Sequence, residues 1–559
     1  TAAQLLVAHF TATPEPIATQ REHVPPELAS LVMRCLEKMP GDRWQSVHDL
    51  QPTLQELVVS IVARPAPIDG IPSPAHARAT ISRVTLSGDA LRAGLQAFEQ
   101  HEWSEAFRAL TAADEGRSLG PAHLERLAEA AWWIGKSDEC IKARERAYAR
   151  YLESGEQRQA ASVAIALAED YFHKLVRAVA NGWMQRAERH LKDLPETIEH
   201  GWMARAQAML ALEEERDSDK AWMLAEKALD IARRLDARDL QTLALQDCGR
   251  ILVSKGRVVE GMAAIVAAMS AAASGQLGPR TTGRIYCNMM STCENLADYR
   301  RASEWNEAAR AWCEPHSQSG FPGICRVHRA QLLRLRGSWP EAEIEARQAS
   351  EELEDFLSDV AAEAYYELGE IKMLTGDLVG ADNYFRQAHE LGRDPVPGLA
   401  LLRLAQGRKE SARALLERAL SDPYRSRLDR ARLLPAQAEV AYASSATDTI
   451  RAAAEELATI AEAYGSPALA ARAAFARGLV ELGEGQPAAA AATLRRAWKL
   501  AKDSDLPYEA ARTRVLLGQA YRACGNTEDA ELELQAAAVS FERLGATADA
   551  QSATALLEG

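Results

Sequence analysis

The chain has 559 residues, of which 47% are hydrophobic and 26% charged, and its net charge is −14. This length exceeds one ordinary globular core, so several domains or a repeat array are expected. The dispersed negative charge argues against nucleic acid as a partner, because phosphate binding needs a basic face. No apolar run approaches about 18 residues, which excludes a membrane span. Eight cysteines without a C-x-x-C pair favour reduced thiols in a cytoplasm.

Residues 1–60 are predicted to form short helices separated by proline-containing turns. Pro26 stands where a helix tolerates proline, and Leu28, Leu31 and Val32 then follow helical spacing. The helix is expected to end before Pro40.

The residue types at a dozen positions of this segment match a known pattern. They are His9, Pro14, Pro26, Leu28, Leu31, Val32, Cys35, Leu36, Lys38, Pro40, Arg43 and Ser46. The segment resembles the C-terminal end of the large lobe of bacterial eukaryotic-like Ser/Thr protein kinases. The resemblance implies that Arg43 is a buried structural arginine, which in that family pairs with the glutamate of an A-P-E motif.

The chemical motifs of a kinase do not occur in this sequence. It contains no G-x-G-x-x-G loop, no V-A-I-K lysine, no H-R-D loop and no D-F-G or A-P-E motif. We therefore expect the chain to be catalytically silent by itself. Because Thr1 is not Met, we also expect it to be the C-terminal part of a longer kinase. ATP and Mg²⁺ are expected for the missing kinase part, and no cofactor is expected for this chain.

Residues 61–88 contain four prolines and show no apolar periodicity. Such a composition is typical of an extended, semi-rigid linker. We expect this segment to separate the kinase tail from the rest of the chain.

Residues 89–545 repeat a pattern of Gly, then Ala five residues later, then Ala seven residues after that. Complete copies are Gly337/Ala342/Ala349, Gly376/Ala381/Ala388, Gly407/Ala412/Ala419, Gly485/Ala490/Ala497 and Gly525/Ala530/Ala537. Relaxed copies begin at His101, Gly135, Gly182, Arg216, Gly256, Ala297 and Ser445. Successive turn positions are 31 to 47 residues apart, and the widest gap, after Gly135, predicts either longer helices or an irregular unit near 150–200.

A small residue in a tight turn lets one helix reverse into the next, and small residues on the second helix let neighbouring helices approach closely. Repeats of this length that pair helices predict an α-solenoid. The pattern resembles tetratricopeptide (TPR) repeats. The predicted fold is therefore all-α: kinase-tail helices, a proline-rich linker, and a right-handed α-solenoid of about twelve TPR-like hairpins, followed by a C-terminal tail at 546–559.

Repeat arrays of this type bind partners on a concave face lined by the first helix of each unit. Residues counted back from the turns to that face are Arg250, Arg284, Asn288, Glu294, Gln331, Arg334, Tyr366 and Glu370. Their mixed charges suit an extended peptide or a partner helix. The alternative is that they are ordinary solvent-facing polar residues.

Two stretches imitate other sites. Gly135-Lys136-Ser137 resembles the end of a phosphate-binding loop, but Ala130 replaces the first glycine of that motif. Cys313, His316, Cys325 and His328 offer the residue types of a zinc site, although cysteine at a small-residue position of the repeat is more often a packing residue.

The sequence thus predicts part of a cytoplasmic bacterial Ser/Thr protein kinase whose array binds protein or peptide partners. Self-association of the array is a further expectation, whereas nucleic acid and membrane are not expected as partners. Two alternatives stay open: a non-catalytic TPR scaffold, and the sensor arm of a helical-repeat transcription regulator.

Overall fold

The computed structural model describes residues 26–35, 88–115, 119–213, 215–313, 321–423 and 425–558. The chain divides into two compact units, Thr1–Thr85 and Leu86–Gly559. In the first unit, helix α3 (Pro26–Cys35) confirms the helix predicted over Leu28, Leu31 and Val32, and it buries Ala29 and Leu31. Arg43 and residues 61–87 of the predicted linker lie outside the described residues.

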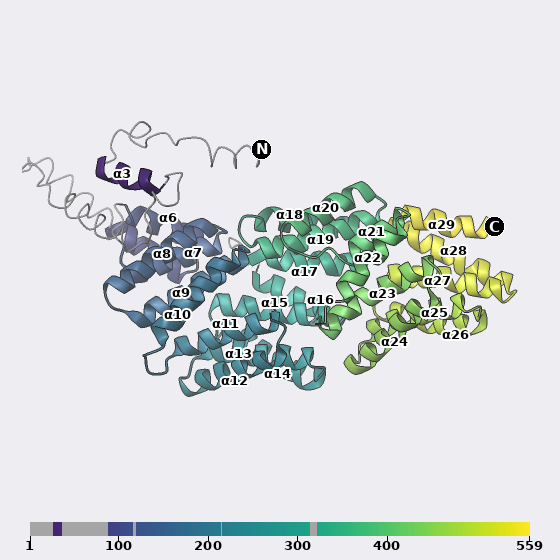
Figure 1. Cartoon of the computed structure of the whole chain (residues 1–559), viewed down its shortest axis with the longest axis horizontal. Helices are drawn as coiled ribbons and strands as arrows, with labels where there is room; N and C mark the ends of the chain where they lie inside the picture. Colours follow the sequence, from purple (N-terminus) through teal and green to yellow (C-terminus); the bar gives the residue numbers. More distant parts are fainter. Residues whose placement is uncertain are drawn as a thin grey trace, which may run out of the picture. The chain divides into compact units, whose positions relative to one another are not determined.

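The second unit is a row of helical hairpins that follow one another from α6 to α29 (Figure 1). The first helices of the hairpins are residues 88–99, α7 (Pro121–Trp133), α9 (Gln157–His173), α11 (Ile198–Glu213), α13 (Arg238–Ser254), α15 (Pro279–Asn295), α17 (Phe321–Leu335), α19 (Ser358–Leu374), α21 (Gly398–Ala405), α23 (Arg427–Ala443), α25 (Pro467–Gly483) and α27 (Pro507–Ala523). The second helices are α6 (Trp103–Ala113), α8 (Ser137–Glu153), α10 (Arg177–Leu191), α12 (Ser218–Arg234), α14 (Val258–Ala273), α16 (Tyr299–Cys313), α18 (Trp339–Leu353), α20 (Leu378–Glu390), α22 (Lys409–Leu420), α24 (Thr447–Tyr464), α26 (Pro487–Asp503) and α28 (Thr527–Leu544). Within the described residues this gives the predicted α-solenoid of twelve hairpins.

The turns inside the hairpins confirm the repeat pattern at eleven of the twelve predicted positions. All five complete copies place their glycine at positive φ, from 72° at Gly485 to 87° at Gly376. The relaxed positions His101, Arg216, Ala297 and Ser445 adopt positive φ as well, although their side chains make that conformation costly. The positions five and twelve residues further on are buried in every hairpin.

The prediction of a turn at Gly182 is wrong. Gly182 lies inside α10, and the chain reverses at Leu175, whose φ is 60°. The N–H of Val176 donates to the carbonyl of Tyr171 at 2.9 Å, the same closure that the other turns make. Ala180 and Ala187 are then the two small residues of a regular hairpin. The predicted irregular unit at 150–200 is therefore absent, and turn spacings run from 31 to 41 residues.

Hairpins that are five apart in the array contact one another. His173 of α9 lies 2.9 Å from Asp359 of α19, and the hydroxyl of Tyr464 donates to the carbonyl of Ser254 at 3.0 Å. The rings of Trp339 and Tyr508 meet edge to face at 5.8 Å. Five hairpins thus complete one turn of the superhelix, and successive turns touch.

Aromatic residues fill the gaps between the small ones, as at Trp132 and Trp133. Trp133 is 1% exposed and stacks on Trp103 with a centroid distance of 5.1 Å. Trp132 packs edge to face against Phe356 at 5.4 Å, which links the second hairpin to the start of the eighth. Gly135 is the adjoining turn, so Gly135-Lys136-Ser137 follows a helix rather than a strand.

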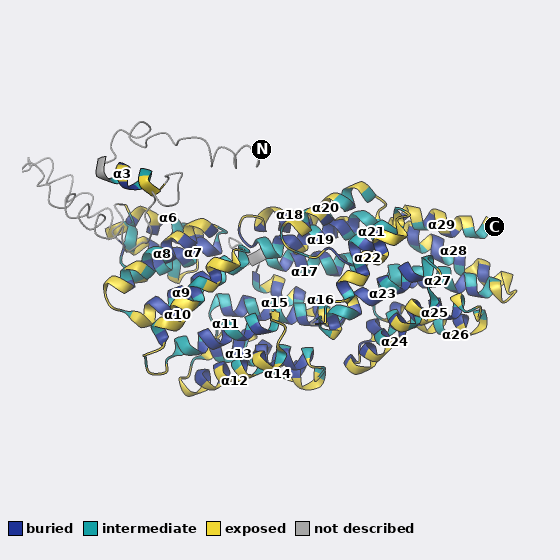
Figure 2. Ribbon diagram, viewed as in Figure 1, coloured by how far each residue is buried: buried dark blue, intermediate teal, exposed yellow. Residues whose placement is uncertain are grey.

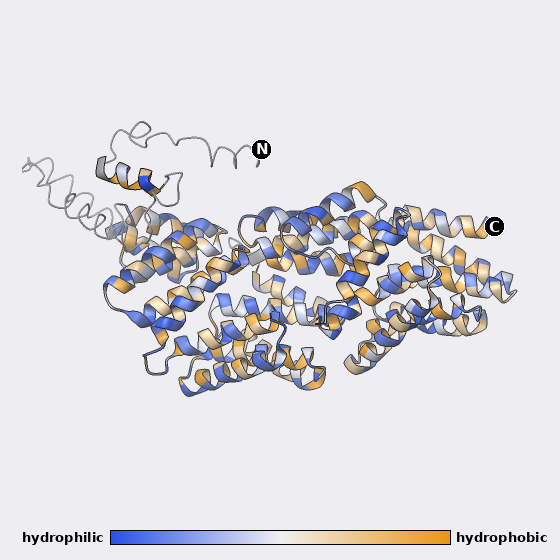
Figure 3. Cartoon of the chain, in the orientation of Figure 1, coloured by the Kyte–Doolittle hydropathy of each residue, from blue (hydrophilic) through white to orange (hydrophobic). Residues whose placement is uncertain are grey.

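The predicted tail at 546–559 forms a further helix, α29 (Thr547–Glu558), over most of its length. It packs on α28 and buries Ala550 and Ala553, and so it covers the end of the last hairpin. Apolar and polar residues alternate along the helices (Figure 3). Among the described residues, no helix is both long enough and apolar enough to cross a membrane.

Candidate binding surfaces of the repeat array

The first helices form the inner face of the array. From α9 to α27, each first helix contacts the first helix of the next hairpin, whereas the second helices make few contacts of this kind. The second helices therefore lie further apart, on the outer face, where exposed residues gather along α10, α12 and α24 (Figure 2). All eight residues predicted for the concave face lie on the first helices α13, α15, α17 and α19.

Three of the eight residues meet in one cluster on α17 and α19. The Arg334 guanidinium lies 2.6 Å from Glu367 and 3.6 Å from Glu370. The hydroxyl of Tyr366 donates to Glu370 at 2.8 Å, and Arg393 lies over the Tyr366 ring at 3.7 Å. Because burial destabilises the phenolate, the pKa of Tyr366 is raised well above its ordinary value. The charged and polar groups of this cluster are therefore paired or hydrogen-bonded with one another.

Glu294 and Gln331 form a second cluster with His328. The Nδ1 of His328 lies 2.9 Å from Glu294, and the Gln331 amide, in its hydrogen-bonding orientation, donates to Glu294 at 3.0 Å. Burial raises the pKa of Glu294 despite His328. Burial alone would lower the pKa of His328, but the charge and hydrogen bond of Glu294 outweigh it, and the pKa is raised.

The remaining three predicted residues also have partners. Arg250 lies 3.1 Å from Glu213, Asn288 donates to Gln246 at 2.9 Å, and Arg284 pairs with Glu169. Glu169 belongs to α9, three hairpins earlier in the chain. The inner face is thus lined by polar residues that bind one another across hairpins. Partner binding by these eight residues stays a prediction, and a partner would have to displace bonds that already exist.

Buried ion pairs extend this inner lining. Arg205 of α11 and Asp247 of α13 are both buried, and their Nε and Oδ2 atoms lie 2.8 Å apart. The pair is close enough for a strong charge interaction, although its geometry is too bent for an aligned hydrogen bond. Burial lowers the pKa of Arg205, with Asp247 acting in the opposite direction. Another buried pair, between Arg144 of the second helix α8 and Asp170 of the first helix α9, joins the second and third hairpins.

Of the four residues with zinc-ligand chemistry, the structure describes Cys313, Cys325 and His328. Cys313 and Cys325 lie together, with their sulfur atoms 3.7 Å apart, but His328 binds Glu294, and His316 lies outside the described residues. Hydrogen bonding to Cys287, together with burial, raises the pKa of Cys325, which disfavours the thiolate that metal binding needs. In the described part of the chain, no three His, Cys, Asp or Glu side chains are arranged to hold a metal.

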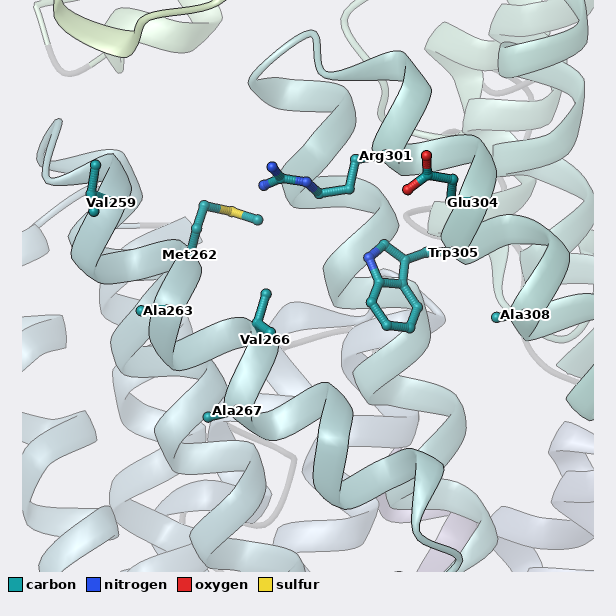
Figure 4. Close-up of a pocket in the computed structure, with 9 residues that line it drawn as sticks. All are labelled: Val259, Met262, Ala263, Val266, Ala267, Arg301, Glu304, Trp305 and Ala308. Atoms are coloured by element: carbon teal, nitrogen blue, oxygen red, sulfur yellow. The ribbon is translucent and has the colours of Figure 1, made fainter.

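The outer face carries a groove of about 840 Å³ between α14 and α16, which we call the α14–α16 groove (Figure 4). Val259, Met262 and Val266 line it from α14, and Trp305 lines it from α16. Val259 is 85% exposed, an unusual position for a valine in a folded chain. Arg301 and Glu304 stand at its edge with opposite charges (Figure 4).

A second groove of about 950 Å³ runs between α26 and α28 and is called the α26–α28 groove. Its apolar residues include Leu532 and Val539 of α28, each 58% exposed. Two cations lie near the Trp498 ring, Lys502 at 5.4 Å and Arg514 at 4.8 Å from the ring centroid.

Sequence reasoning did not find either groove. The available signal was an apolar residue where the repeat places solvent, as at Val259, three residues after the turn glycine, rather than at the buried fifth and twelfth positions. Polar residues counted on the first helices cannot indicate the α14–α16 groove, because Val259 is apolar and lies on the second helix α14.

Comparisons with known proteins bear on the fold alone. No protein-family model matches the sequence, and no curated protein matches it. The chain is similar to a solved APC/C hetero-tetramer of Cut9 and Hcn1, with 13% identity and a TM-score of 0.37, over 85% of this chain and 98% of that one. It is also similar to a Rap protein complexed with Competence and Sporulation Factor, with 13% identity and a TM-score of 0.37, over 69% and 99% of the two chains.

Proposed function

We propose that this chain is a helical-repeat scaffold that binds protein or peptide partners, and that it is the C-terminal part of a cytoplasmic bacterial Ser/Thr protein kinase. Stacked helical hairpins present long surfaces on which partners bind. The kinase part of the proposal is supported by the resemblance carried by His9, Cys35, Arg43 and the other matching positions before residue 60. ATP and Mg²⁺ would bind kinase segments that this sequence does not contain.

The observation that carries the binding role is the α14–α16 groove. Val259 and Val266 expose apolar surface beside Trp305, and burying that surface against a partner releases ordered water. Contiguous exposed apolar patches of this kind mark interaction sites more often than they mark ordinary surface. By contrast, the polar residues of the inner face already bind one another.

Photo-crosslinking in the source cell tests the binding role. A benzoylphenylalanine introduced at Val259 is expected to form a covalent adduct with a second polypeptide. The control places the same group at Arg300, which is on the neighbouring helix α16 and has an 88% exposed side chain outside the groove. Adducts at Val259 but not at Arg300 support the proposal, and equal or absent adducts at both positions contradict it.

The gene sequence upstream of the Thr1 codon tests the kinase role. H-R-D, D-F-G and A-P-E motifs in the same reading frame would supply a catalytic domain and a partner for Arg43. A stop codon directly upstream would contradict that role and leave a non-catalytic scaffold. A DNA-binding domain in the same frame would instead favour the sensor arm of a transcription regulator.

A further inference from the structure

The α26–α28 groove differs from the α14–α16 groove in its charge. Its lining contains four basic side chains, Arg336, Lys502, Arg514 and Arg543, and one acidic side chain, Asp505. Asp505 lies 4.0 Å from Arg336, and Arg514 lies 3.6 Å from Glu533, outside the groove. In the described part of the chain, no ion pair is formed by Lys502 or Arg543. A local excess of positive charge thus occurs in a chain whose net charge is −14.

The same groove has an apolar side formed by α28. Leu532 and Val539 are seven residues apart, so both project from one face of the helix two turns apart. Trp498 of α26 also lines the groove, and Lys502 and Arg514 lie near its ring. Apolar side chains with basic side chains around them fit a ligand that has one apolar face flanked by carboxylates.

We propose that the α26–α28 groove binds an acidic amphipathic helix of a partner protein. Apolar residues of that helix contact Leu532, Val539 and Trp498, while its carboxylates pair with Lys502 and Arg543. The net negative charge of the chain repels an acidic ligand elsewhere and so directs it to this groove. The inference rests on the proposed function, because it names the partner class of one surface of the scaffold.

A nucleic acid is a poorer match for these residues. A phosphate backbone satisfies the basic side chains but leaves Leu532 and Val539 exposed to water. A helix between two helices buries both kinds of side chain at once. The ligand is therefore a protein segment rather than a nucleic acid.

Fluorescence anisotropy with designed peptides tests this inference on the full chain. The probe is a labelled helical peptide of about 20 residues, roughly 30 Å long, with leucines along one face and glutamates beside them. One control peptide carries lysine in place of each glutamate, and another carries glutamine in place of each leucine. The acidic leucine peptide is expected to bind at least about tenfold more tightly than either control. Its affinity should fall as salt is added.

Variants of exposed groove residues locate the site. The L532D/V539D and K502E/R543E double variants are each expected to weaken binding about tenfold or more. Matched controls are Val379→Asp on α20, where the valine is 84% exposed, and Arg418→Glu on α22, where the arginine is exposed. Both controls should bind like the wild type. The K502E/R543E variant should gain affinity for the lysine peptide, a result that a misfolded variant cannot give.

Several outcomes would overturn the inference. These are no preference for the acidic leucine peptide, unchanged binding by both groove variants, or tighter binding of a labelled DNA duplex at the same residues. If sedimentation shows a dimer that the groove variants dissociate and the peptide does not, the occupant is a second copy and the inference is wrong. If the peptide does not bind as expected but Val259 still gives specific adducts, only this inference is wrong. If both experiments fail, the proposed binding function is wrong as well.

Discussion

The inner and outer faces of the array differ in their side chains: polar residues are paired on the inner face, whereas apolar residues are exposed on the outer face. On the inner face, charged residues such as Arg334 and Glu294 are held by partners from neighbouring hairpins. On the outer face, Val259 and Leu532 stand exposed in grooves. The inner residues fix how hairpins stack, while the outer grooves leave surface free for partners. A polar inner face is therefore not by itself evidence of a binding site in a tightly wound solenoid.

The largest loss of stability is expected from breaking a buried ion pair on the inner face. Asp247→Asn leaves the Arg205 guanidinium buried beside a neutral group, which costs about 3–5 kcal/mol of stability. Chemical unfolding followed by circular dichroism measures this loss. Asp230→Asn on the outer helix α12 is a matched control, because Asp230 is exposed and pairs with an exposed Arg234. Equal effects of the two substitutions would refute the inner-face account.

A smaller effect is expected where two helices touch through glycines. A Cβ on Gly261 of α14 would lie 2.5 Å from the carbonyl oxygen of Gly249 on α13, and backbone cannot move aside as a side chain can. Gly261→Ala is therefore expected to cost about 1–3 kcal/mol. Gly182→Ala in α10 meets open space and is expected to stabilise the chain slightly. Thermal unfolding compares the two, and a stabilising Gly261→Ala would contradict the packing described.

The contact between successive superhelical turns is expected to depend on pH. Burial alone would lower the pKa of His173, but Asp359 and also Glu169 outweigh burial and the opposing charge of Arg284, so the pKa is raised above its ordinary value of 6.5. Protonated His173 therefore stabilises the fold fully below about pH 6.5, and this contribution is lost as pH rises through the raised pKa.

Asp359→Asn tests this dependence. The variant is expected to lose roughly 1 kcal/mol at low pH, the worth of one hydrogen bond, and to equal the wild type more closely above the raised pKa. Melting temperatures of both proteins across that range supply the measurement. A difference that grows with rising pH would have the wrong sign and exclude the role given to His173.

The smallest effect on stability is expected in the grooves. Val259→Asp should change the free energy of unfolding by less than about 0.5 kcal/mol, because the side chain is already in water. The same substitution should abolish crosslinking to a partner from the neighbouring Val266. A large loss of stability would show that Val259 is a structural residue instead.

The sequence alone predicted most of the helical hairpins, but it predicted neither the ion-pair partners of the inner face nor the grooves of the outer face. Hairpin turns were found even at Ala297 and Ser445, because the small or apolar residues five and twelve positions later keep the same register. Leu175 was missed because leucine rarely adopts positive φ, and a glycine seven residues later gave a more conventional turn.

The inner-face residues were placed on the correct helices by counting back from the turns. Their ion-pair partners could not be predicted from the sequence, because Glu169 pairs with Arg284 across three hairpins and His173 pairs with Asp359 across five. Such pairs depend on how tightly the superhelix winds, which no local pattern encodes. The grooves depend on the same winding, because the spacing of outer helices decides whether Val539 and Trp498 border one cleft.

Hydrogen–deuterium exchange of the full chain, with and without the acidic leucine peptide, tests the contrast between the two faces most directly. Slower exchange on peptide addition is predicted for α26 and α28, with α13, α15, α17 and α19 unchanged. Slower exchange in those four inner helices, with α26 and α28 unchanged, would contradict the account and return the binding site to the inner face.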